Sequence, residues 1–293
     1  MDNISCISSL QAVVENLLVQ TFSEEQRSGH ETETSSHASE RMQLPIQSID
    51  RISSAISLDD FFQKYLLKNI PCIISKWITK DWTSCKQWSV LHNGRSLPNF
   101  QEFLGLGSSV VSVADCRKRE FNSQPKEDWL LKDYLAYLEN YINSGYPKEQ
   151  RCLYLKDWHL TRDHPDLKVY SVPTYFSDDW LLELYSHGQP PFDDDFRFVY
   201  IGPKQSWTPF HADVFRSYSW SANVCGKKKW LLYPPGYEDQ LRNEAGKLPY
   251  DIRVLEHCSS EKKCPISIIQ EAGEIVFVPS GWYHEVINLV GSC

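Results

Sequence analysis

The sequence predicts a mainly β protein with flanking helices, in which a jelly roll forms the C-terminal part of the chain. Short apolar segments follow one another from Phe196 onward, separated by Gly, Pro and polar residues. They are FRFVYIG, PFHADVF, YSWSANVCG, KKWLLYP, CPISIIQ, EIVFVPS and HEVINL. Hydrophobic residues make up 41% of the chain and aromatic residues 13%, which is enough to bury the core of such a fold.

The overall charge argues against a general nucleic-acid binder. The chain has 30 Lys and Arg against 38 Asp and Glu, for a net charge of −8, so a broad cationic surface is not expected. No apolar run reaches the roughly 18 residues that a membrane span needs. The nine cysteines are scattered without a CxxC pair, and no basic segment opens the chain, so we expect a reducing compartment: the cytoplasm, with the nucleus as the alternative.

Three regions are expected along the 293 residues. Residues 1–43 form a largely disordered N-terminal segment, because residues 23–41 contain no large apolar side chain. His30 and His37 lie there and are expected to be solvated. Residues 44–195 form a helix and strand region, and residues 196–293 form the jelly-roll core.

The helix and strand region is predicted element by element. Ser57 is a good N-cap for a helix over residues 58–69, which must end before the Ile-Pro pair at residues 70–71. PCIISKW, SSVVSVADC and RCLYLKDWHL read as strands. Helices are expected over residues 97–104, 127–143 and 178–187. Trp77, Trp82 and Trp88 are interpreted as core aromatics rather than a binding cage, and Asp193, Asp194 and Asp195 as solvated rather than a cation site.

His211 and Asp213 are the first candidate metal ligands. Residues two apart on a strand project from the same face, about 7 Å apart at the backbone, so the imidazole and the carboxylate could share one ion. His284 lies in another β-prone run, and two His with one carboxylate is the ligand set of non-haem Fe(II) oxygenases. A bare HxD pattern also fits a hydrogen-bonded strand histidine, and spacing alone does not require His284 as the third ligand.

The wider context of these residues resembles the JmjC-domain oxygenases, the Fe(II)- and 2-oxoglutarate-dependent branch of the cupins. The segments that carry the resemblance are FRFVYIGPKQSWTPFHAD, GKKKWLLYPPG and EAGEIVFVPSGWYHEVINL, and the likeness covers about residues 45 to 290. It implies a cupin-like fold with Fe(II), 2-oxoglutarate as co-substrate and dioxygen. It also selects His284 as the third ligand; the histidines passed over are His159, His164, His187 and His257. A zinc fragment of His257, Cys258 and Cys264 is the weaker alternative.

The resemblance further implies a pocket for the far carboxylate of 2-oxoglutarate. It places Lys228 at the binding lysine and Thr208 at the hydroxyl that pairs with it. The alternatives are a solvated lysine hairpin and a strand-entry hydroxyl. Tyr154 and Lys156 either touch the co-substrate or are ordinary strand residues, and the second interpretation is favoured. Ser221 stands where relatives often have Asn, and Trp220 is expected to pack the barrel.

The function implied by the resemblance is protein hydroxylation coupled to decarboxylation of 2-oxoglutarate to succinate. Within the family, the likeness is strongest to the small hydroxylases, and it implies a lysyl residue of a translation termination factor as the target. The alternatives are a histone lysine demethylase of the same chemistry and a non-catalytic cupin-like binding protein or inactive truncated form. No direct nucleic-acid partner is expected.

The end of the chain departs from the family pattern. Cys293 follows His284 by nine residues, so we expect the last core strand and the C-terminal helices of the family to be missing. Those helices often form a dimer interface. A homodimer is therefore expected for full-length relatives rather than for this chain.

Overall fold

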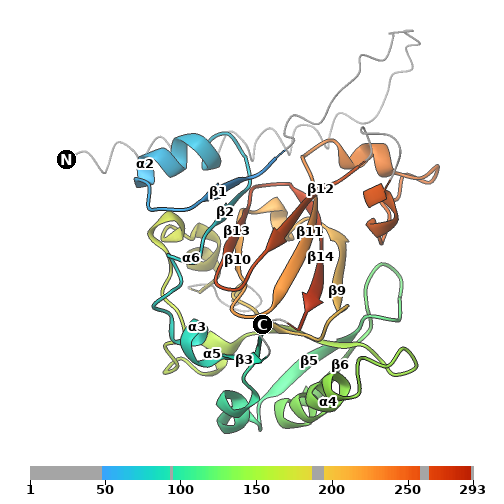
Figure 1. Ribbon diagram of the computed structural model, residues 1–293. Helices are drawn as coiled ribbons and strands as arrows, with labels where there is room; N and C mark the ends of the chain where they lie inside the picture. Colours follow the sequence, from blue (N-terminus) through green and yellow to red (C-terminus); the bar gives the residue numbers. More distant parts are fainter. Residues whose placement is uncertain (1–47, 93–94, 187–194, 258–263, 292–293) are drawn as a thin grey trace. The chain divides into compact units, whose positions relative to one another are not determined.

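Two four-stranded sheets form the frame that carries the functional residues (Figure 1). The computed structural model describes residues 48–92, 95–186, 195–257 and 264–291. The first sheet has the strand order β1 (Asp50–Ile52), β2 (Cys72–Ile74), β13 (Ile275–Val278), β10 (Ser219–Ala222). The second has the order β12 (Ile266–Gln270), β11 (Lys227–Tyr233), β14 (Tyr283–Val290), β9 (Trp207–His211). In both sheets, strands that are far apart in the sequence pair side by side. They form the jelly-roll core that the sequence predicted.

Apolar side chains from both sheets meet in one core cluster. Trp230 and Leu232 of β11 pack with Val276 and Val278 of β13, and Ile73 of β2 joins them. β13 is buried along its whole length, as expected for a strand covered on both faces. The two sheets are therefore held together by a continuous apolar layer.

A third sheet lies under the longest helix and supplies one wall of the functional site. Its order is β6 (Lys126–Leu130), β5 (Val110–Asp115), β7 (Leu153–Trp158), β8 (Val199–Ile201). Helix α4 (Leu131–Asn143) covers this sheet (Figure 1), and its buried residues are Leu131, Tyr134, Leu135, Leu138 and Tyr141. The Tyr134 hydroxyl donates to the carbonyl of Ile201 at 2.5 Å, which ties α4 to β8.

Two predicted helices differ from the structure. The helix expected over residues 127–143 begins only at Leu131, because residues 126–130 pair as the edge strand β6 with β5. The short helix expected over residues 97–104 is present as a 3₁₀ helix, but it covers Phe100–Leu106, because residues 97–98 belong to strand β4 (Arg95–Pro98). β4 pairs with β3 (Ser89–His92). In both places a neighbouring strand offered backbone hydrogen bonds that a local apolar pattern does not reveal.

The remaining elements follow the prediction more closely. Ser57 caps α2 (Leu58–Phe61) by accepting from the backbone amide of Asp60, and a π-helical turn continues to Leu66. The predicted strands appear as β2, β5 and β7, and the last predicted helix as α6 (Trp180–Ser186). The other short helices are α3 (Thr83–Gln87), α5 (Leu160–Asp163) and the 3₁₀ helices Thr174–Phe176, Val214–Arg216, Glu238–Leu241 and Arg253–His257.

Several single-residue predictions are settled by burial. Trp82 and Trp88 are buried and Trp77 is partly buried, so these are core aromatics. Asp195, expected to be solvated, is instead buried, and its carboxylate accepts from the Arg197 guanidinium at 2.8 Å. Trp220 packs in the core cluster around Phe61 and Phe277, as predicted.

The cysteines only partly match the expectation of free thiols. Cys72, Cys85, Cys116, Cys152 and Cys225 are free, whereas Cys264 is disulfide-bonded. None of the described helices is long and apolar enough to cross a bilayer. The N-terminal segment 1–43, His187, Asp193, Asp194 and Cys258 lie outside the described residues. The division of the chain into a helix and strand region that ends at residue 195 and a jelly-roll core that begins at residue 196 remains a prediction.

Candidate metal centre

His211, Asp213 and His284 come together although the third ligand is distant in sequence. One ligand atom from each of the three lies within 4.8 Å of the others. Nε2 of His211 is 3.9 Å from Oδ1 of Asp213, and Nε2 of His284 is 4.0 Å from the same oxygen. These separations exceed hydrogen-bond length, so the three donors surround a common point rather than bonding to one another.

Strand register explains why the two histidines meet. His211 on β9 lies directly opposite His284 on β14, and the rings are 4.4 Å apart between centroids. A register irregularity follows between His284 and Val286. The prediction that Asp213 shares a strand face with His211 was wrong. β9 ends at His211, and the aspartate lies in extended backbone just beyond the strand. The carboxylate reaches the histidines from the start of a 3₁₀ turn instead of from the strand face.

Each histidine is oriented by the carbonyl two residues before it. Nδ1 of His211 lies 2.8 Å from the carbonyl of Pro209, and Nδ1 of His284 lies 3.3 Å from that of Trp282. A carbonyl only accepts, so Nδ1 carries a proton in both rings, and Nε2 is the nitrogen that faces the Asp213 carboxylate. Such backbone contacts fix the tautomer of metal-binding histidines.

Asp213 is oriented from the opposite sheet. The hydroxyl of Ser219, the first residue of β10, donates to Oδ2 of Asp213 at 2.5 Å. That bond leaves Oδ1 facing both imidazoles. The carboxylate is thus presented through one oxygen, as a monodentate ligand needs.

The electrostatics of the site keep His211 in its metal-binding form. Burial lowers the pKa of His211 to about 4, the neighbouring His284 ring adds to this effect, and Asp213 opposes it. The imidazole is therefore neutral at physiological pH, and the neutral ring is the species that coordinates metals.

The donor set fits a divalent iron. Nitrogen and oxygen ligands bind such ions at about 2.0–2.2 Å, so a central ion can be shared by donors that lie about 4 Å apart. Two imidazoles and one carboxylate on one side leave the other positions for a co-substrate and dioxygen, which is the arrangement of non-haem Fe(II) oxygenases.

Lys228 lies in a buried polar network on the same sheet as the triad. Of the three successive lysines, Lys228 is the buried one, so the solvated hairpin does not describe it. Lys228 is directly opposite Asn288 of β14, and its ammonium donates to the Asn288 side-chain oxygen at 2.9 Å. The same ammonium lies 3.5 Å from the Tyr154 hydroxyl. A buried ammonium is a suitable group to bind a carboxylate ligand.

The other predicted pocket residues lie close to this network. Thr208 is half-buried on β9, opposite Val286, three residues before His211. Tyr154 and Lys156 are both buried on β7. Ser221 lies on β10, where its carbonyl accepts from Gln270 at 2.7 Å, and its side chain has no demonstrated part in the site.

Three polar residues escaped the sequence analysis. Asn288 holds Lys228, Ser206 accepts from the Asn288 amide at 2.8 Å, and Ser219 holds Asp213. Asn288 was within reach of pattern reasoning: it is four residues after His284, and residues two apart on a strand share a face. Ser206 and Ser219 carry no such signal, because their partners come from other strands.

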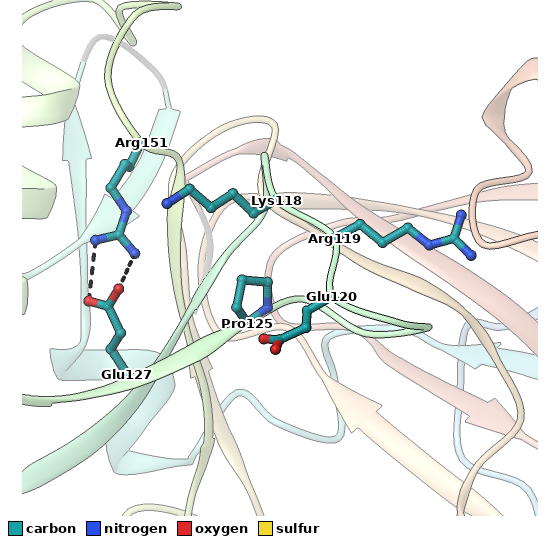
Figure 2. A pocket seen from close by; sticks show the side chains of 6 residues that line it. All are labelled: Lys118, Arg119, Glu120, Pro125, Glu127 and Arg151. Carbon is teal, nitrogen blue, oxygen red and sulfur yellow. Dashed lines mark hydrogen bonds and ion pairs between the residues drawn. The ribbon is translucent and has the colours of Figure 1, made fainter.

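A surface cavity of about 420 Å³ lies apart from the triad. It is lined by Lys118, Arg119, Glu120, Pro125, Glu127 and Arg151 (Figure 2). Figure 2 shows the Arg151 guanidinium turned to Glu127, and Arg151 also bonds the buried Asp115 at 2.9 Å. The charges of this cavity are thus largely balanced internally, and none of its residues belongs to the metal centre.

Comparison with known proteins agrees with the geometry. A family model described as JmjC domain, hydroxylase, matches residues 198–293. The Gallus gallus protein named 2-oxoglutarate and iron-dependent oxygenase JMJD4 is 50% identical over 249 residues, which cover 82% of this chain and 57% of that protein. The Homo sapiens protein of the same name is 50% identical over 243 residues, which cover 80% of this chain and 57% of that protein. The Arabidopsis thaliana protein named arginine-specific demethylase JMJ20 is 41% identical over 264 residues, covering 83% and 55%.

The chain thus spans a little over half the length of these relatives. The region matched by the family model contains His211, Asp213 and His284, and the similarity to the relatives extends over most of the chain. The fold, the triad and the comparisons lead to the same conclusion: the chain belongs to the JmjC-domain family.

Proposed function

We propose that this chain is an Fe(II)- and 2-oxoglutarate-dependent protein hydroxylase, and that its target is a lysyl residue of a translation termination factor. The observation that carries the oxygenase part is the cluster of His211, Asp213 and His284, together with the buried hydrogen-bond network around Lys228 on the same sheet. The names of the relatives in chicken and human support it. The lysyl target rests on the family resemblance of the sequence.

Each residue of the site has a defined task in this proposal. His211, Asp213 and His284 hold the metal through Nε2, Oδ1 and Nε2. Lys228 binds the far carboxylate of 2-oxoglutarate, and Thr208 supplies a hydroxyl beside it. Bound iron and 2-oxoglutarate supply the activation of dioxygen, with release of succinate and carbon dioxide, and the protein's share is to orient these reactants and exclude water.

Burial of the pocket supports this division of tasks. Lys228, Asn288 and Ser206 are all at most 5% exposed, so a carboxylate bound there is removed from water. A charge-assisted hydrogen bond is stronger in such surroundings than at the surface. We further propose that the substrate is a protein and that this chain acts in the cytoplasm.

A demethylase of the same chemistry is the second candidate. The relative from Arabidopsis thaliana that is 41% identical is named an arginine-specific demethylase, and another from that plant, 28% identical, is named a lysine-specific demethylase. Both reactions begin with hydroxylation of a carbon. Only demethylation hydroxylates an N-methyl group, which then leaves as formaldehyde.

The first experiment measures succinate release by the purified chain with Fe(II), 2-oxoglutarate and ascorbate. We expect turnover that is lost in His211→Ala. The matched control is His164→Ala. The His164 imidazole is hydrogen-bonded to the Ser109 hydroxyl at 2.9 Å and does not belong to the triad. A folded wild-type chain that binds no iron and releases no succinate would contradict the oxygenase assignment and favour a binding protein.

The second experiment separates the two enzymatic candidates. Mass spectrometry of a translation termination factor, incubated with the chain, is expected to show one added oxygen on a lysine without formaldehyde release. Methylated histone peptides serve as the comparison substrates. Formaldehyde from those peptides, with an unmodified termination factor, would overturn the hydroxylase proposal in favour of the demethylase.

A further inference from the structure

Cys116 and Cys152 form a buried pair of thiols at one end of the β5–β7 ladder. The register pairs Asp115 of β5 with Leu153 of β7, and the next residue on each strand is one of the two cysteines. The backbone amide of Cys116 donates to the carbonyl of Cys152 at 2.9 Å, so the ladder continues to this pair. Both thiols are free, and the two residues are only 7% and 3% exposed. Two cysteines thus lie directly opposite each other on neighbouring antiparallel strands.

The geometry of this pair suits a disulfide bond. Opposite residues of an antiparallel pair have Cα atoms about 4.5–5.5 Å apart and project their side chains from the same face. A disulfide spans Cα separations of about 4.4–6.8 Å. The two cysteine side chains belong to one core cluster and are in hydrogen-bond contact with each other. The bond can therefore form between strands that are already in place.

The surroundings make Cys152 the more reactive of the two thiols. Contact with Cys116, the charge of Arg117 and the Tyr141 hydroxyl lower the pKa of Cys152, although burial opposes them. Burial raises the pKa of Cys116. The exposed Arg117 also donates to the Tyr141 hydroxyl at 3.0 Å, so a surface cation reaches the surroundings of the pair. The thiolate is the species that attacks an oxidant, so Cys152 is the expected nucleophile.

Oxidation of Cys116 leaves its main neighbour hydrogen-bonded. The Cys116 thiol donates to the carbonyl of Trp207, the first residue of β9, at 3.6 Å. The same carbonyl accepts from the Gln124 side-chain amide at 3.0 Å, and the Trp207 indole donates to the Cys116 carbonyl at 3.0 Å. These two bonds do not involve the sulfur. Loss of the thiol proton therefore leaves no unsatisfied acceptor at Trp207.

We propose that Cys116 and Cys152 are a reversible redox modification site, which a hydroperoxide closes to a disulfide and a dithiol reopens. The Cys152 thiolate attacks one oxygen of hydrogen peroxide, becomes a sulfenic acid and releases hydroxide. The Cys116 sulfur then attacks the Cys152 sulfur and displaces its hydroxyl group, which leaves as water with the Cys116 proton. In total, two thiols lose two electrons and two protons, and one hydrogen peroxide becomes two waters. The inference goes beyond the proposed function and does not depend on it.

The test follows each cysteine by mass spectrometry. The chain is loaded with Mn²⁺, so that no iron is present to split the peroxide, and is exposed to hydrogen peroxide. Denaturant with N-ethylmaleimide then stops the reaction and labels the remaining thiols. We expect a cross-linked pair of peptides that contains Cys116 and Cys152 and is two hydrogens lighter than the reduced pair. Dithiothreitol is expected to reverse the cross-link.

Cys72 is the matched control within the same chain. It is free and fully buried, but its neighbours across the strands are Asp50 and Phe277 rather than a second cysteine. The pair is expected to react about tenfold faster or more, because one pKa unit changes the thiolate fraction about tenfold. Oxidation of the pair at the rate of Cys72, or to separate sulfinic acids without a cross-link, would overturn the inference.

Two variants test the order of the steps. In Cys116→Ser, the sulfenic acid formed on Cys152 has no thiol opposite it and is expected to be trapped by dimedone. In Cys152→Ser, Cys116 is expected to stay unmodified at the same dose of peroxide. A dimedone adduct on Cys116 in the second variant would overturn the assignment of Cys152 as the attacking thiol.

Thermal unfolding gives an independent readout. A disulfide between residues 116 and 152 closes a long loop and restricts the unfolded chain. The oxidised wild type is therefore expected to unfold at a higher temperature than the reduced wild type. Cys116→Ser is expected to unfold at the same temperature with and without peroxide. A lower unfolding temperature for the oxidised wild type would show that the bond distorts the fold, and the inference would be wrong.

Discussion

The ligand residues of the metal centre are each held by one specific hydrogen bond. Carbonyls two residues upstream fix the imidazoles of His211 and His284, and the Ser219 hydroxyl fixes Asp213. The histidine bonds are local and come with the strand conformation. The bond from Ser219 joins two sheets, so it depends on the tertiary structure.

Removal of that hydroxyl provides a prediction at the residue scale. Ser219→Ala is expected to weaken metal binding by about 10- to 100-fold, because residues that orient metal ligands have effects of this size. The fold should be retained, since the serine is only half-buried. Titration with Mn²⁺ followed by calorimetry measures the effect. Ser217→Ala in the preceding turn is the control, and equal affinities in the two variants would refute the role of Ser219.

Lys156 provides a prediction about pH. Burial lowers its pKa to about 8 from the usual 10.5; Lys126 and Lys228 lower it further, and Asp157 and Cys116 oppose them. Between these two values the unfolded chain binds more protons than the folded chain, so this group makes the protein more stable as pH rises. Below about pH 8 the lysine is charged in both states and the penalty is complete.

The measurement is urea unfolding of the metal-free wild type and of Lys156→Met from pH 7 to 10.5. The variant lacks the titrating group. Subtracting its free energy of unfolding from that of the wild type therefore cancels the contributions of most other titrating groups. The free energy of unfolding of the wild type is expected to rise relative to that of the variant above about pH 8. A difference that stays constant across this range would show that Lys156 has an ordinary pKa.

At the scale of elements, the end of β8 is in tight contact with the polar network. A Cβ added to Gly202 would lie 2.4 Å from Oγ of Ser206 and 2.5 Å from Cδ2 of Tyr154. Both neighbours are connected to Lys228 by hydrogen bonds. Ser206 accepts from Asn288, which in turn accepts from Lys228, and the Tyr154 hydroxyl contacts the Lys228 ammonium directly. The close approach of β8 therefore keeps the residues of the proposed co-substrate pocket in place.

Gly202→Ala is accordingly expected to cost about 1–3 kcal/mol of stability, the usual range for overpacking, and to weaken 2-oxoglutarate binding. Gly105→Ala is the matched control, because a Cβ there meets no atom within 4 Å. Thermal unfolding and calorimetry measure the two effects. Wild-type affinity in a destabilised Gly202→Ala variant would show that the pocket tolerates displacement of Tyr154 and Ser206.

At the scale of the whole molecule, the metal centre connects the two sheets of the jelly roll. His211 and His284 belong to the β12-β11-β14-β9 sheet, and Asp213 is bonded to β10 of the other sheet. An ion bound by all three residues is therefore expected to stabilise the fold as a unit. A ligand that binds only the folded state adds about 2.7 kcal/mol at 100 times its Kd.

Metal removal tests this connection. Saturating Mn²⁺ is expected to raise the unfolding temperature of the wild type, and a chelator is expected to reverse the change. His211→Ala, which loses one of the three ligands, should show little of this stabilisation. An equal increase in the variant would indicate that the ion binds elsewhere on the chain.

The parts that could be predicted from sequence are those with local causes. The Ser57 cap and strands such as β2, β5 and β13 follow from residue type and spacing within a few positions. The spacing of His211 and Asp213 also indicated the pair, although the aspartate lies just beyond the end of β9 rather than on the strand. Thr208 and Lys228 were assigned by resemblance, and the structure shows that Lys228 is buried. The helix expected over residues 127–143 was placed too early, because its first turn was taken up by pairing with β5.

The sequence by itself determined the fold class, the two-residue spacing of the first ligands and the family resemblance, since strand periodicity and side-chain chemistry are properties of short segments. Only the tertiary structure decided that His284 lies opposite His211, that Asn288 holds Lys228 and that Lys156 is buried with no ion pair to another described residue. These facts depend on strand register across sheets and on which charges are already paired. Both arise from contacts between residues far apart in the chain, which no local pattern contains.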